Sequence, residues 1–345
     1  MPYTTIDKPT DYFNTVLWSG NSSTQSITGV GFQADFVWIK DRSGGNDHQI
    51  LDSVRGATKA LSSNRTDLNT FSDGLTSFDS DGYSLGNNTR YNASGSNYVG
   101  WNWLAGGTAS SNSDGSTTSS VSANTTSGFS IVKFTGTGSA TTLGHGLGAV
   151  PKWILVKTLD RTENWVVYHV GNDASAPEDK SIRLDGTNAV QDNSGHFNDT
   201  APTSSVFSVG NGAGVNPSGE DQIAYCFAEK KGYSKFGTYK GNSNADGPFV
   251  YTGFKPSFII GKVSSDTNDW FMFDNKRSTF NAVDDSLFPN KSDAESTSHV
   301  IDFLSNGFKI RDSDGTVNST GNTYIYMAFA ESPFVSSKGI PTTAR

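Results

Sequence analysis

The sequence predicts an all-β protein made of three tandem β-sandwich repeats, with little helix. The first observation is a ten-residue pattern that occurs three times, at residues 31–40, 148–157 and 253–262. The second is the abundance of turn-forming residues, including 37 glycines in 345 residues. The third is the scarcity of glutamate, a good helix former, which occurs six times.

The repeated pattern, which we call the anchor segment, contains a glycine, a short turn-like stretch and an apolar run led by an aromatic residue. A distance of 117 residues separates the first two copies, and 105 separate the second from the third. A continuous apolar run opened by Gly or Pro predicts a strand that is buried on both faces. Each copy closes with a lysine: Lys40, Lys157 and Lys262.

Further strands are expected around each anchor segment. An aromatic-bounded strand that ends in a glycine turn precedes it, at residues 12–20, 129–136 and 233–241. A short strand follows it after a polar turn, at residues 48–52, 165–169 and 270–274. Asp-Gly and Asn-Gly turns favour a tight hairpin at residues 78–85 and 303–310, and the second repeat keeps the shorter equivalent 206–210.

The last strand of each repeat alternates large and mostly small residues, as the period of two in a β-strand predicts. We expect the large face to fill the core between the two sheets of its own repeat. The small face, which includes Cys226, should allow a neighbouring unit or loop to pack closely. The large residues are Val99, Trp101 and Trp103, then Ile223, Tyr225 and Phe227, then Ile325, Met327 and Phe329.

These segments divide the chain into three units. The segment 106–127 consists almost entirely of Ser, Thr, Gly, Asn and Asp, which predicts a flexible linker. An alternative to independent tandem units is an interlocked assembly with pseudo-threefold symmetry, in which the units share sheets. The predicted parts are an N-terminal arm (1–11), repeat 1 (12–105), the linker (106–127), repeat 2 (128–231), repeat 3 (232–335) and a C-terminal tail (336–345).

Composition excludes several classes of partner. The net charge of −8 disfavours nucleic acid, because an acidic surface repels phosphates. No apolar run is long enough to span a bilayer, and the polar start of the chain does not resemble a signal peptide. The lone Cys226 cannot form an internal disulfide, and we expect it to be a packing residue.

The sequence predicts no catalytic, cofactor-binding or metal-binding residues. Two acidic turns, at residues 79–82 and 312–315, resemble fragments of a calcium loop but lack its twelve-residue spacing, so we interpret them as structural turns. The histidines do not have the spacing of a metal site. They are His48, His145, His169, His196 and His299.

The acidic residues and the tryptophans bear on a sugar-binding or sugar-cleaving role. A glycosidase needs a paired acid and nucleophile or base, yet most of the 34 acidic residues lie in turns. The tryptophans mostly occupy repeated strand positions, which predicts core packing; Trp165 and Trp270 lie closest to loops. No ligand-binding residue can be singled out from Trp18, Trp38, Trp101, Trp103, Trp153, Trp165 and Trp270.

Several motifs of the first repeat together resemble a known group of proteins. They are residues 1–9, 31–43, 52–59 (Asp-Ser-Val-Arg-Gly-Ala-Thr-Lys), 78–83 and 98–107. This set is similar to repeat-containing virion proteins of bacteriophages, frequent in marine phages, with concanavalin-like or jelly-roll sandwich domains. Repeats 2 and 3 keep the anchor and last strands but lack the Asp-Ser-Val-Arg-Gly segment.

The resemblance implies a non-enzymatic structural protein exposed on a virion: a tail fibre, spike or head decoration. It implies other virion proteins as partners, with adhesion to a host-surface glycan and, by analogy with fibres, a homotrimer. Two alternatives stay open: a depolymerase of capsule or lipopolysaccharide, and a structural adaptor that binds no receptor.

Overall fold

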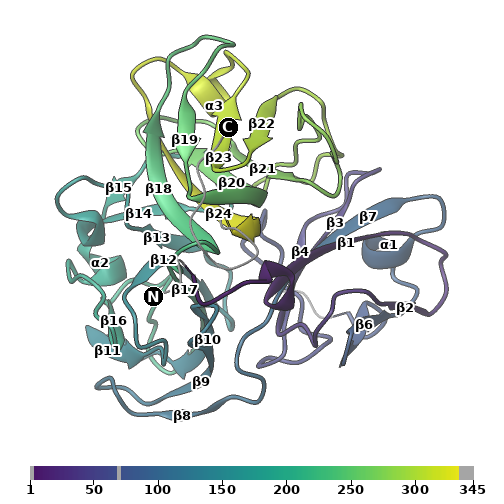
Figure 1. Ribbon diagram of the computed structural model, residues 1–345. Helices are drawn as coiled ribbons and strands as arrows, with labels where there is room; N and C mark the ends of the chain where they lie inside the picture. The colour runs from purple at the N-terminus through teal and green to yellow at the C-terminus, as the bar shows by residue number, and fades with distance from the viewer. Residues whose placement is uncertain (1–3, 68–70, 334–345) are drawn as a thin grey trace.

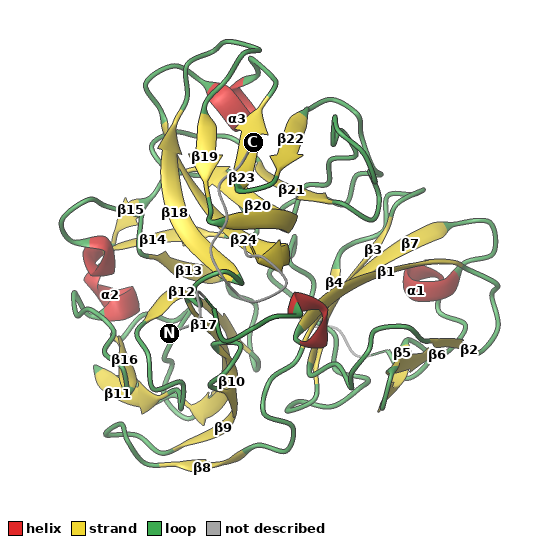
Figure 2. Cartoon of the chain, viewed as in Figure 1, coloured by secondary structure: helices red, strands yellow, loops and turns green. Residues whose placement is uncertain are grey.

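The computed structural model describes residues 4–67 and 71–333 (Figure 1). Within these residues the protein is all-β, as predicted, and its helices are single turns (Figure 2). The predicted tail 336–345 lies outside the described residues. The helical turns are η1 (Pro9–Asp11), α1 (Thr89–Asn92), η2 (Pro177–Asp179), α2 (Ser194–Phe197) and α3 (Gly315–Asn318).

We use first, second and third unit for the predicted ranges 12–105, 128–231 and 232–335. Each unit has a main antiparallel sheet that contains its anchor strand. In the first unit the order is β1 (Phe13–Ser19), β7 (Asn97–Trp103), β3 (Phe36–Asp41) and β4 (Gln49–Asp52). In the third unit it is β18 (Ser234–Lys240), β24 (Thr323–Pro333), β20 (Phe254–Val263) and β21 (Trp270–Asp274).

The main sheet of the second unit has eight strands. Its centre repeats the same order with β10 (Phe129–Thr135), β17 (Asp221–Ala228), β12 (Pro151–Thr158) and β13 (Val166–His169). Beyond β13 lie β14 (Lys180–Arg183) and β15 (Gln191–Asp192). All three anchor segments are therefore strands, as predicted.

A smaller antiparallel sheet packs against each main sheet. The first unit has β2 (Gln25–Ile27), β6 (Gly82–Leu85) and β5 (Leu75–Asp79). The second has β11 (Thr141–Gly144) and β16 (Val206–Val209). The third has β19 (Phe249–Tyr251), β23 (Gly307–Ile310) and β22 (Ile301–Leu304).

The prediction that residues 106–127 form a flexible linker is wrong. This segment contains β8 (Ser110–Asn112) and β9 (Ser119–Asn124), and β9 pairs with β10 of the second unit. Val121 lies opposite Val132 in this pairing and is 6% exposed. Small polar residues such as Ser and Thr fit a sheet when a neighbouring strand satisfies their backbone groups.

The large faces of the last strands are buried, but the prediction of where they point is wrong. Trp101, Tyr225 and Met327 belong to one continuous core that also contains Trp38, Trp153 and Trp270. All three main sheets contribute to this central core, and Figure 1 shows the three groups of strands arranged around it. The large residues therefore pack between units.

The small faces of the last strands line the separate core within each unit. Leu104 packs against the core of the first unit, Ala224 and Cys226 lie in that of the second, and Ala328 lies in that of the third. Cys226 is fully buried, and burial raises the pKa of its thiol. It is thus a packing residue, as predicted.

Hydrogen bonds between units surround the central core. In each unit, the last residue of β4, β13 or β21 forms a hydrogen bond with the last strand of the next unit. The first unit contacts the second, the second contacts the third, and the third contacts the first. These bonds join Tyr225 Oη to Asp52 at 2.7 Å, His169 Nε2 to the Tyr326 carbonyl at 3.0 Å, and Trp101 Nε1 to Asp274 at 3.0 Å.

A second set of contacts runs in the opposite direction. The indole N–H of Trp165 donates to the Ser62 carbonyl of the first unit at 2.8 Å, and that of Trp270 donates to the Arg183 carbonyl of the second at 2.8 Å. His48, at the matching position of the first unit, is fully buried near the Phe288 carbonyl of the third. Each sheet draws its strands from one unit, with β8 and β9 added to the second, so the units share a core without sharing sheets.

Because the three units share this core, we expect one cooperative unfolding transition. Trp103→Ala should lower the free energy of unfolding by about 3–5 kcal/mol, since Trp103 is 1% exposed and packs against Phe13 and Phe36. Chemical denaturation followed by circular dichroism measures this. Phe280→Ala is the control, because Phe280 is 84% exposed. Separate transitions for the units would contradict the shared core.

Candidate functional site

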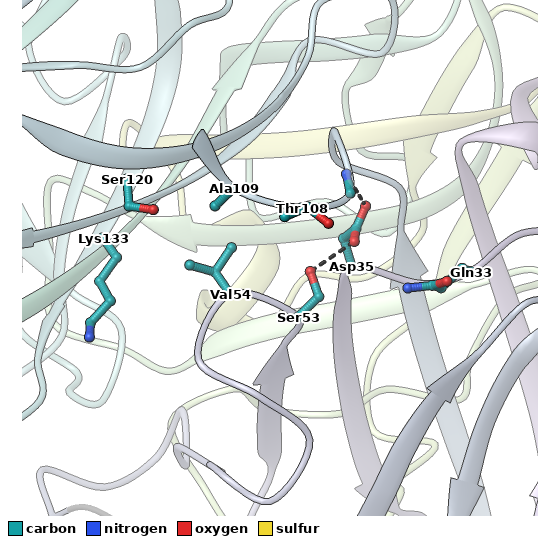
Figure 3. A pocket seen from close by; sticks show the side chains of 9 residues that line it. Gln33, Asp35, Ser53, Val54, Thr108, Ala109, Ser120 and Lys133 are labelled. Carbon is teal, nitrogen blue, oxygen red and sulfur yellow. Dashed lines mark hydrogen bonds between the residues drawn. The ribbon is translucent and has the colours of Figure 1, made fainter. Parts of the chain in front are cut away.

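A polar recess lies between the first and second units (Figure 3). Its volume is about 570 Å³. The segment just before β3 and the turn after β4 form one side, and the chain after β7 together with β9 and β10 forms the other. The lining residues are Gln33, Asp35, Ser53, Val54, Gly107, Thr108, Ala109, Ser120 and Lys133.

Asp35 holds the two sides of this recess together. It is 1% exposed, and its carboxylate accepts hydrogen bonds from Ser53 Oγ at 2.8 Å, the Ala105 N–H at 2.9 Å and the Gly107 N–H at 3.2 Å. These bonds fix the chain where it leaves β7 and crosses to the second unit. Asp35 thus has a structural role.

The remaining polar groups of the recess are better placed to meet a ligand. Figure 3 shows Gln33 and Asp35 at one end, Lys133 and Ser120 at the other, and Thr108 between them. Lys133 also forms an ion pair with Asp221 at 2.7 Å. Of the described residues that line the recess, only Asp35 is acidic, so the recess does not supply the two carboxylates of a glycosidase.

The tryptophans take no part in this recess. All seven are at least 90% buried, including Trp165 and Trp270, which lie near loops in the sequence but are fully buried in the central core. A tryptophan that stacks on a sugar ring from the surface is therefore not available here. Among the described residues, the exposed large aromatic side chains are Phe249, Tyr251 and Phe280.

The acidic turns have structural partners. Asp81 accepts hydrogen bonds from the N–H groups of Gly29 and Gly31 at 3.0 and 2.6 Å, and this lowers the pKa of its carboxyl. Asp314 caps α3 by accepting from the Thr316 N–H at 2.7 Å. Among the described residues no group of three His, Cys, Asp or Glu side chains is arranged to hold a metal ion.

The closing lysines of the anchor segments have a role that the sequence did not reveal. Lys40, Lys157 and Lys262 are fully buried, and each ammonium group donates to a backbone carbonyl of the loop after its strand. The loop acceptors are Gly44, Glu163 and Asp266. Lys40 donates to the carbonyls of Asp41 at 2.6 Å and Gly44 at 3.0 Å. The lysines thus hold loops that would otherwise leave buried carbonyls unpaired.

Lys157 also links two units. Its ammonium group donates to the Glu163 carbonyl and to the Thr66 carbonyl of the first unit, the latter at 2.6 Å. Burial lowers the pKa of each of the three closing lysines to about 8. The recurrence of Lys at one position of the repeat was the signal that could have identified this function.

Residues 8–333 match DUF7483, a family described as a domain of unknown function. The chain belongs to this family. No curated protein and no solved structure matches it. The DUF7483 match spans all three units. Among the described residues no helix has the length and apolar character needed to cross a membrane.

The lowered pKa values of the three closing lysines predict how the free energy of unfolding depends on pH. Below about pH 8 the three lysines are charged in both the folded and the unfolded protein, so the free-energy cost of burying their charges is fully present. Between about pH 8 and 10.5 the unfolded chain binds more protons, so the free energy of unfolding should rise with pH. Buried tyrosines such as Tyr83, whose pKa lies well above 10, should reverse this trend at higher pH.

Urea denaturation at several pH values between 7 and 10 tests this expectation. Lys40→Met should reduce the slope of stability against pH by roughly a third, because one of three similar groups is removed. Lys8→Met is the matched control, since the Lys8 side chain is 72% exposed. A slope that Lys40→Met leaves unchanged would show that the buried lysines do not titrate as described.

Proposed function

We propose that this protein is a non-enzymatic structural component of a bacteriophage particle: a tail fibre, spike or head decoration. We further propose that it consists of three tandem β-sandwich repeats of the concanavalin-like or jelly-roll kind. The observation that carries this proposal is the central aromatic core, closed by hydrogen bonds that run from each unit to the next. Such a body resists local opening without disulfides, as an exposed part of a particle must.

A buried asparagine in each unit supports the repeat interpretation. Each of the three is fully buried, and its amide donates to backbone carbonyls of the surrounding loops. The acceptors are the Gly86 carbonyl for Asn92 at 3.0 Å, the Gly210 carbonyl for Asn216 at 2.7 Å and the Asp312 carbonyl for Asn318 at 2.6 Å. Each acceptor closely follows the matching strand β6, β16 or β23, so the same local structure occurs three times.

The location of the protein tests the first part of the proposal. Purified particles of the phage that encodes this chain should contain it in a fixed number of copies, measured by mass spectrometry. A reconstruction of the particle should show its three-part outline at a surface position. Particles that lack the protein altogether would contradict the proposal.

We also propose that the recess between the first and second units binds a glycan of the host surface. Amide, hydroxyl and ammonium groups from Gln33, Thr108 and Lys133 line a volume that accommodates a sugar residue. These groups can donate to and accept from sugar hydroxyls, although none of the described residues that line the recess is aromatic.

A glycan array tests this second proposal. Ala109→Trp should fill the recess and reduce glycan binding at least tenfold, because Ala109 lines its wall. Ser110→Trp is the control, since the neighbouring Ser110 is exposed and does not line the recess. Equal binding by both variants would exclude this site, and release of oligosaccharide from host capsule would favour a depolymerase instead.

A further inference from the structure

The first strand of the main sheet meets different neighbours in the second and third units. In the second unit β10 is covered by β9, which comes from the segment 106–127. In the third unit the matching strand β18 is the edge of its sheet within the described part of the chain. Lys133 on β10 and Thr238 on β18 are equivalent, because they lie opposite the matching residues Ile223 and Ile325 of the last strands.

The second unit uses its own chain to close the gap between its two sheets. Val121 of β9 enters the core of the unit, and Thr117 forms a parallel bridge to Leu143 of β11. Ser116 also hydrogen bonds to the hydroxyls of Thr141 and Thr142. Figure 1 shows β8 and β9 lying outside β10. Residues 115–124 therefore join β10 of one sheet to β11 of the other.

The corresponding gap in the third unit is an open groove between β18 and β19. Two adjoining recesses of about 540 and 480 Å³ form it, and both are lined by Lys235 and Tyr251. Phe249 and Tyr251 on its rim are 46% and 58% exposed. The second and third units are joined by a short turn, in which the Tyr233 N–H donates to the Lys230 carbonyl, so the chain between them has no segment like β9.

At the edge of β18, alternate backbone N–H groups point away from β24. Those of Ser234 and Phe236 are already hydrogen-bonded within the chain, and Thr238 lies beyond them, in the lining of the groove. The Ser234 N–H donates to the Lys230 carbonyl at 2.9 Å, and the Phe236 N–H donates to the Glu229 carboxylate at 3.3 Å, so both point away from β24. Because alternate residues of an antiparallel strand point the same way, the Thr238 N–H also points out of the sheet. In the second unit the equivalent Lys133 pairs with Ser120 of β9.

We propose that this groove binds an extended strand of another polypeptide, added to the β18 edge as β9 is added to β10. The strand should be rich in Ser and Thr and carry a small or β-branched apolar residue at every second position, as Val121 and Ala123 do in β9. The side chain opposite Gly237 would rest near the Tyr326 ring, which also lines the groove. This mode is strand addition to a sheet edge, and it does not depend on the proposed glycan site or virion location.

A peptide of residues 115–126 is the probe. Fluorescence anisotropy with the full-length protein should detect saturable binding of the labelled peptide. Thr238→Pro removes the outward N–H and should weaken binding at least tenfold, because proline cannot donate to the added strand. Thr238→Ala keeps the N–H and should bind the peptide as the wild type does.

A second measurement uses the wild-type protein, so its result does not depend on the folding of the proline variant. In the wild-type protein, the peptide should slow hydrogen exchange in residues 236–240 and leave β1 of the first unit unchanged. A peptide with Asp in place of Val121 should neither bind nor protect. Absence of peptide binding to the wild type, or equal binding by the proline and alanine variants, would overturn the proposal.

Discussion

The structure depends on the packing of three aromatic strand faces against one another. Each last strand lies inside its main sheet, so its large residues meet those of the other two units while its small residues face the core of its own unit. Both faces of these strands are therefore buried, which explains their apolar sequences. Removing one unit would expose the large faces of the other two, so we regard the three as one folding body.

The two open sites follow from how the chain connects the units. The recess lies where residues 106–109 leave the first unit and β9 joins the second, and buried Asp35 fixes that crossing. The groove exists because the short connection to the third unit leaves β18 at the edge of its sheet. The segment that contains β9 thus closes the gap between the two sheets of the second unit. In the described part of the chain the third unit has no such segment, and the corresponding gap stays open.

Local patterns predicted the strands well and their neighbours poorly. The anchor segments and last strands were recognised because a period of two and a recurring aromatic position are local signals. The prediction that the Trp101 face points into its own unit was wrong, because alternation shows which residues share a face and not what that face packs against. The prediction of a flexible linker was wrong because the composition around Val121 does not reveal that this segment pairs with β10. The recess joins residues from Gln33 to Lys133, which sequence spacing alone cannot bring together. By contrast, one ion pair can be read from local spacing: Asp52 pairs with Arg55 and Asp274 with Arg277, three residues apart in each case. The second unit has His169 at the position of the aspartate.

The directional contacts between units also bear on how such a chain could have evolved. Each unit contacts the next unit through one surface and the previous unit through a different surface. The third unit contacts the first, so the three form a closed ring. Head-to-tail interfaces close into a ring at one copy number only. A gene duplication that added a fourth copy would find no vacant position, and a deletion to two copies would leave a wedge open to water. An elongated repeat array can lengthen one repeat at a time, whereas contacts closed in this way are complete at three units.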